Sequence, residues 1–136
     1  ENVVFDGVDA EAVALLDFDF AAPGRPVHDL ASMIRMCGPV DDDVNATRNG
    51  FPPVDRARRA RLAADAYGLD APGRAELLVA LDDAMARGGE FVRRRVEAGD
   101  PNFIAMWEAM GGQERFDRRR RWWAEVRPSF EAALVA

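Results

Sequence analysis

The hydrophobic pattern of this chain changes once, near Pro26, and that change constrains the fold more than any other feature. Before Pro26, two short apolar runs, Val3–Phe5 and residues 13–16, are separated by a polar segment with a turn signal at Asp6-Gly7. Short apolar runs bounded by turn residues are typical of strands. The beginning of the chain is therefore predicted to form a β-hairpin, and the rest follows the period of a helix.

The first predicted helix begins at Asp29, which we interpret as its N-cap in preference to a metal ligand. It carries an apolar face that ends with Cys37, a residue we expect to be buried, and it stops at Gly38-Pro39. Residues 41–53 are predicted to form a loop.

Later helices are marked by their caps. Asp55 is predicted to cap a helix that stops at Gly68, and Pro72 begins a longer one that runs towards Gly99. Gly88-Gly89 lies inside that pattern and can kink or break it. A further helix spans residues 100–112.

The last helix starts near Gln113, and Pro128 is expected to restart it as a short terminal helix. The fold class is thus mainly α with a small N-terminal β-hairpin, and four or five helices are expected. The residues predicted to be largely buried are Leu30, Ile34, Leu62, Leu78, Leu81, Phe91, Trp122 and Phe130.

Length and charge exclude several classes of protein. The 136 residues are enough for one domain with a core, and the net charge of −6 argues against a general nucleic-acid binder. No apolar run approaches the roughly 20 residues of a membrane span, and no secretory signal is visible. A single cysteine fits a reducing compartment, so a cytoplasmic location is expected.

Three segments carry a resemblance to a known family: NVVF, LLDFDFA and PVHDLA. Together they resemble the catalytic region of the aminoglycoside phosphotransferase and choline kinase family, relatives of the protein kinases. In that family a loop H-x-D-x-x-x-x-N leads into a strand, a turn, a second strand, an I-D-[FWY]-[DE] motif and a helix that begins at [WYH]-D-L-A. The later stretches VDRARRARLAADAYGL and RRRVEAGDPNFIAMWE are similar to the helical subdomain of actinobacterial members.

The resemblance implies that residues 1–136 are the C-terminal lobe of a kinase-like, ATP-dependent phosphotransferase. Its substrate would carry a hydroxyl on an aminoglycoside-like or other cationic small molecule. Asn2 and Asp17 match the Mg²⁺ ligands of the family, and Asp19 is a supporting carboxylate beside them. An antiparallel hairpin would bring Asn2 and Asp17 to the same end, and both offer the oxygen ligands that Mg²⁺ prefers.

The chain departs from the family pattern in four respects. The catalytic Asp would lie five positions before Asn2, and the glycine-rich loop, the phosphate-binding lysine and the nucleotide lobe have no counterpart in the sequence. We therefore expect a fragment that is inactive alone, binds neither ATP nor Mg²⁺ tightly, and can self-associate through the face meant for the missing lobe. The alternative is a non-catalytic helical interaction module, and an H-G-D within eight positions upstream of Glu1 would favour the enzyme.

Two features are candidates for the substrate side. Asp41, Asp42 and Asp43 can attract a cationic substrate, although a solvated loop is the preferred interpretation. Trp107 is expected in the core, or else at a substrate cleft. His28, the only histidine, is expected at a loop or helix start and cannot build a catalytic dyad.

The arginine runs at 93–95 and 118–121 are expected to be solvated. Neighbouring residues on a helix are about 100° apart, so neither run lies on one face.

Overall fold

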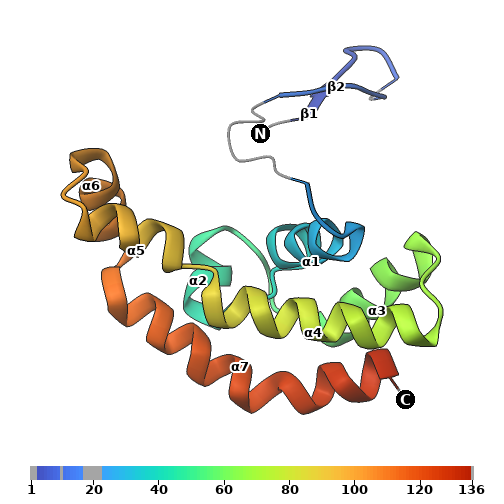
Figure 1. The fold of residues 1–136 in the computed structure, drawn as a ribbon. Helices are drawn as coiled ribbons and strands as arrows, with labels where there is room; N and C mark the ends of the chain where they lie inside the picture. The colour runs from blue at the N-terminus through green and yellow to red at the C-terminus, as the bar shows by residue number, and fades with distance from the viewer. Residues whose placement is uncertain (1–2, 10, 17–22, 136) are drawn as a thin grey trace.

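The computed structural model describes residues 3–9, 11–16 and 23–135. It begins with an antiparallel β-hairpin of two strands, β1 (Val3–Phe5) and β2 (Ala12–Leu15), which stands apart from the helices (Figure 1). Val3 is paired with Leu15. The predicted hairpin is confirmed.

The turn of the hairpin is held by one side chain. A carboxylate oxygen of Asp6 accepts hydrogen bonds from the backbone N–H groups of Asp9 and Glu11, at 2.9 and 3.3 Å. Every residue of both strands is exposed, including Phe5 at 58 %. The hairpin is therefore closed by its own hydrogen bonds and not by packing against the helices.

Seven helices are present in the described part of the chain, where four or five were expected. They are α1 (Pro26–Cys37), α2 (Asp43–Arg48), α3 (Arg56–Tyr67), α4 (Ala71–Arg87), α5 (Glu90–Glu97), α6 (Pro101–Met110) and α7 (Gly112–Val135). No described helix is both long enough and apolar enough to cross a bilayer.

Two boundaries near the start of the helical region differ from prediction. α1 begins at Pro26, three residues before Asp29, so Asp29 lies inside the helix and the N-cap prediction was wrong. Proline suits a first helical position because its missing N–H would be unpaired there anyway. The predicted loop at 41–53 contains α2, because the Asp42 side chain caps a helix there.

The predicted caps of α3 at Asp55 and Gly68 are confirmed, and Asp70 and Asp100 are further N-caps that were not predicted. Asp55, Asp70 and Asp100 accept hydrogen bonds from backbone N–H groups in the first turns of α3, α4 and α6. Gly68 and Gly111 end α3 and α6 with positive φ angles of 83° and 96°, a conformation that favours glycine.

Gly88-Gly89 breaks the long helical pattern into α4 and α5. Gly89 also allows a close approach: a Cβ added there would lie 2.3 Å from the Phe116 ring. The absence of a side chain thus lets α7 pack directly against the junction.

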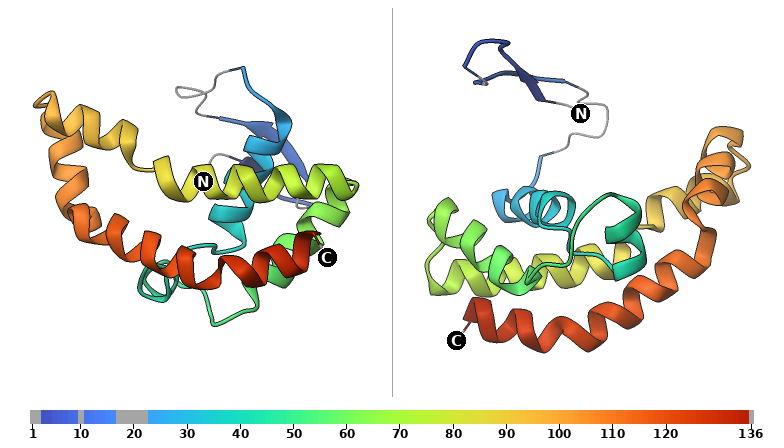
Figure 2. Two further views of the ribbon diagram at one scale, coloured as in Figure 1. Left: turned by 60° about the horizontal axis from the view of Figure 1, so that its bottom comes forward. Right: turned by 180° about the vertical axis from the view of Figure 1, so that it is seen from behind.

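Pro128 does not restart the last helix, because α7 runs without interruption from Gly112 to Val135. An internal proline removes one backbone hydrogen bond, but this helix also packs against α3 and α4 (Figure 2).

The core lies among α1, α3, α4 and α7, with α4 in contact with both α1 and α7. The prediction of burial is confirmed for Leu30, Ile34, Leu78, Leu81 and Phe130.

Three burial predictions were wrong, and a fourth holds only in part. Leu62 is 57 % exposed because α3 packs through the small residues Ala57, Ala60 and Ala64 instead. Phe91 is 46 % exposed, since α5 packs on α6 beyond the core. Cys37 is exposed at the end of α1, and Trp122 is half-buried.

Candidate functional site

The residues expected to hold Mg²⁺ cannot be placed: Asn2, Asp17 and Asp19 lie outside the described residues. What the structure does place is the pair Val3 and Leu15, which are cross-strand partners. The ends of β1 and β2 that adjoin the expected ligands in sequence are therefore neighbours. Within residues 3–9, 11–16 and 23–135, no group of three or more His, Cys, Asp or Glu side chains is arranged to hold a metal ion.

The side chain of Asp42 is buried and accepts several hydrogen bonds. It is 3 % exposed, and one carboxylate oxygen accepts from the backbone N–H groups of Val44 and Asn45, at 3.1 and 3.2 Å. The same oxygen accepts from Arg118 Nε of α7 at 2.8 Å, and the Asn45 amide donates to the other oxygen at 2.6 Å. Burial opposes the charge, but these donors outweigh it and hold the pKa of Asp42 below its ordinary value.

The two flanking acids differ from each other. Asp41 is 7 % exposed, accepts from the Asn45 amide at 3.2 Å and lies 3.8 Å from Arg115. Asp43 has an exposed carboxylate that pairs with Arg56 at 2.7 Å. The solvated-loop interpretation was therefore wrong for Asp41 and Asp42, because α7 supplies arginines that the local sequence does not reveal.

The arginine run 118–121 is also not uniformly solvated. Arg115, Arg118 and Arg119 lie three and four residues apart on α7, so they share a helix face, and Arg119 is only 3 % exposed. Burial, reinforced by the charges of Arg35 and Arg115 and opposed by Asp41, lowers the pKa of the Arg119 guanidinium. For the run at 93–95 the prediction is confirmed, since all three residues are exposed.

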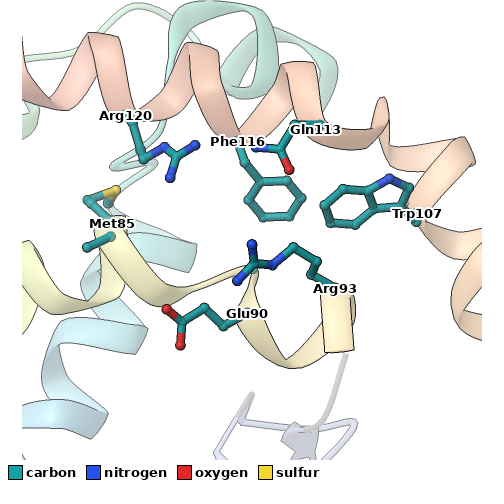
Figure 3. Close-up of a pocket in the computed structure, with 9 residues that line it drawn as sticks. Met85, Glu90, Arg93, Trp107, Gln113, Phe116 and Arg120 are labelled. Atoms are coloured by element: carbon teal, nitrogen blue, oxygen red, sulfur yellow. The ribbon is translucent and has the colours of Figure 1, made fainter. Parts of the chain in front are cut away.

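Trp107 lies at a pocket and not in the main core. Its indole stacks on the Phe116 ring, with ring centres 4.9 Å apart and planes 15° from parallel, so that α6 and α7 together form an aromatic wall (Figure 3). The cavity has a volume of about 80 Å³ and is lined by Met85, Ala86, Gly89, Glu90, Arg93, Trp107, Gln113, Phe116 and Arg120.

That volume limits what the aromatic pocket can hold. About 80 Å³ is the space of two or three waters at roughly 30 Å³ each, so it accommodates a small group and not a whole aminoglycoside. The polar groups around it carry both charges: Glu90 and Arg93 lie beside each other on α5, and Arg120 comes from α7 across from them (Figure 3). Arg120 is already paired with Asp117.

A larger cavity, of about 320 Å³, lies between α1 and α4. It is lined by His28, Ser32, Arg35, Ala80, Asp83, Ala84, Arg87 and Gly88. His28 is in the first turn of α1, as expected of a helix-start residue. The sequence did not predict this cavity. Its lining residues come from two helices, and the sequence of neither helix alone indicates that the two pack together.

Comparisons of the chain with models of protein families, with curated proteins and with solved structures found no match. The features that bear on function are therefore the hairpin, the helices and these clusters of side chains.

Proposed function

We propose that this chain forms the C-terminal lobe of an ATP-dependent phosphotransferase of the aminoglycoside phosphotransferase and choline kinase type. The observation that carries the proposal is the hairpin register, in which Val3 pairs with Leu15. In the sequence, Asn2 directly precedes Val3, and the Asp17-Phe-Asp motif follows the second strand. The strand, turn, strand and helix at Pro26–Cys37 succeed one another in the order that the motif resemblance implies.

The donor set fits the metal of such an enzyme. An amide oxygen from Asn2 and a carboxylate from Asp17 are hard ligands suited to Mg²⁺, and Asp19 adds negative charge beside them. When bound, Mg²⁺ neutralises the charge on the ATP phosphates during transfer to a substrate hydroxyl. This chain would supply both ligands from segments that adjoin, in the sequence, the paired residues Val3 and Leu15.

The exposed apolar side chains of the hairpin support the proposal that a further lobe covers them. Phe5, Val13 and Leu15 are each about 60 % exposed, although two strands alone are only marginally stable in water. Further strands of a nucleotide-binding lobe would cover these side chains. The same exposed residues explain why the chain by itself is expected to self-associate.

The substrate side would lie near α2 and α6. Arg48 of α2 donates a hydrogen bond to the carbonyl of Ala109 in α6 at 2.8 Å, so the helix that begins at Asp43 and the helix that carries Trp107 are neighbours. Asp43 offers an exposed carboxylate to a cationic substrate, whereas the buried Asp41 can add only a fixed charge behind it.

Phosphate transfer from ATP to a panel of aminoglycosides and amino alcohols, catalysed by the complete gene product that contains this chain, tests the proposal. Asp17→Asn and Asn2→Ala should lower kcat/KM by about 100-fold or more, because each removes a group that positions the metal. Asp9→Asn is the matched control, since Asp9 is an exposed acid in the turn of the same hairpin. It should leave kcat/KM unchanged.

The isolated chain provides the second arm and should transfer no phosphate, because a pair of metal ligands supplies neither nucleotide positioning nor a base. Full activity of the Asp17→Asn protein would overturn the metal assignment. If the complete product transfers phosphate to nothing in the panel, the non-catalytic interaction module becomes the better description.

A further inference from the structure

Four arginines converge near the Asp41–Asp42 pair, and the charges do not balance. Arg118 is paired with Asp42 at 2.8 Å, and Arg115 lies 3.8 Å from Asp41. The charge of Asp41 acts on both Arg35 of α1 and Arg119 of α7, and the charge of Asp42 acts on Arg119 as well. Neither has an ion pair or hydrogen bond with any residue that the structure describes, so two positive charges are left over.

Arg119 is the sharper case. Its side chain is 97 % buried, and its Nε atom has no hydrogen-bond partner among the described residues. Among the described residues, Arg119 has one specific contact, with the face of Phe116, whose ring centre lies 5.0 Å from the guanidinium carbon. Burial of a charge without a partner is strongly unfavourable, and natural proteins rarely tolerate it without a ligand or an ion.

The cavity between α1 and α4 lies near both guanidinium groups. Arg35 is one of its lining residues. Arg119 does not line the cavity but lies next to Gly88, which does: a Cβ placed on Gly88 would be 3.2 Å from Arg119 Nη2. Ser32 and His28 add hydrogen-bonding side chains to the wall, and the negative charge of Asp83 is already paired with Arg87.

We propose that the cavity between α1 and α4 binds the phosphate group of a small molecule, with Arg35 as its direct cationic contact and the buried Arg119, next to Gly88, as a second positive charge. Phosphate fits better than a monocarboxylate, because two unpaired guanidinium groups match the charge of a dianion. A volume of about 320 Å³ leaves room for more than the phosphate itself. The proposal does not rest on the proposed function, since it uses neither the hairpin nor a metal.

Calorimetric titration of the chain with inorganic phosphate at constant ionic strength tests this site. Saturable binding is expected, and Arg35→Gln should weaken it by about tenfold or more, the effect of one charge-assisted hydrogen bond. Arg94→Gln is the matched control: Arg94 is an exposed arginine on α5, away from the cavity, and its loss should not change the affinity. Equal losses in the two variants would overturn the proposal and indicate non-specific attraction.

Arg119→Gln separates an electrostatic role in phosphate binding from a purely structural role through its melting temperature. Without phosphate the variant should be at least as stable as the parent chain, because it removes a buried unpaired charge. Phosphate should raise the melting temperature of the parent chain by more than that of the variant. A variant that is less stable in both buffers by the same amount would overturn the assignment.

Two further ligands identify the source of the phosphate. Tighter binding of glycerol 1-phosphate than of inorganic phosphate would assign a phosphorylated metabolite, and equal affinity would assign the free ion. Acetate binding as tight as that of phosphate would contradict the preference for a dianion.

Discussion

The hairpin and the helical core of this protein are stabilised in opposite ways. In the hairpin, Asp6 closes the turn with two hydrogen bonds while Phe5 and Leu15 remain exposed. In the core, Leu77 and Leu81 of α4 are fully buried between neighbouring helices. The helices therefore share a buried core, whereas the hairpin has local hydrogen bonds without burial.

The strongest test of this contrast is a matched pair of truncations. Leu81→Ala should lower the free energy of unfolding by about 2–5 kcal/mol, because it leaves a cavity in a packed core. Val13→Ala, at a 60 % exposed hairpin position, should change it by less than about 0.5 kcal/mol. Urea denaturation followed by circular dichroism measures both, and a comparable loss for Val13→Ala would show that the hairpin belongs to the cooperative core.

Acid should weaken the helical region through Asp42. The folded pKa of this residue is below the unfolded value of about 3.9, so its charge contributes stability above that value, and the contribution is lost as pH falls through the folded pKa. Asp42→Asn should cost about 1–2 kcal/mol at pH 7 and flatten the fall in stability between about pH 5 and pH 2.

Urea titrations of both proteins across that range measure the effect of Asp42. Asp43→Asn is the control, because Asp43 is largely exposed. Parallel pH curves for the parent chain and Asp42→Asn would exclude this ion pair as a source of the acid sensitivity.

A smaller effect is expected in the turn of the hairpin. Asp6→Ala removes the acceptor for the N–H groups of Asp9 and Glu11, so these amides should exchange faster with deuterium. The free energy of unfolding of the helices should stay within about 0.5 kcal/mol of its original value. Hydrogen exchange measured by NMR reports both, and Asp9→Ala, which keeps the acceptor, serves for comparison.

The last test measures self-association and not stability. Leu15→Glu should reduce self-association in sedimentation velocity, because it places charge on the exposed hairpin face. Val79→Glu, at an equally exposed apolar position on α4, should leave self-association unchanged. If both substitutions act alike, association is a property of the whole surface and the hairpin has no special need of a partner.

Local signals account for the parts of the fold that the sequence predicted. The Asp6-Gly7 turn and the caps at Asp55 and Gly68 depend on residues a few positions apart, so they can be read directly. Burial of Asp42 depends on Arg118, which lies 76 residues away in the chain. For that reason the acidic triplet looked like a loop.

The arginines show the same limit more clearly. Four consecutive arginines look alike in the sequence, and only the packing of α7 selects Arg119 for burial while Arg120 and Arg121 stay exposed. The burial prediction was wrong for Leu62 for the converse reason. α3 packs on the core through its alanines, so the larger Leu62 side chain is exposed to solvent. The expected ligands Asn2 and Asp17 lie outside the described residues, so that prediction remains to be tested.

The lack of a side chain at Gly89 determines how closely the start of α5 can approach α7. The Phe116 ring occupies the space that any side chain at position 89 would need, 2.3 Å from where its first carbon would be. Enlarging this residue would act as a wedge and swing α5 and α6 away from α7, carrying Trp107 off the Phe116 ring. The width of the aromatic pocket is thus sensitive to the size of the residue at position 89, which itself lines the pocket.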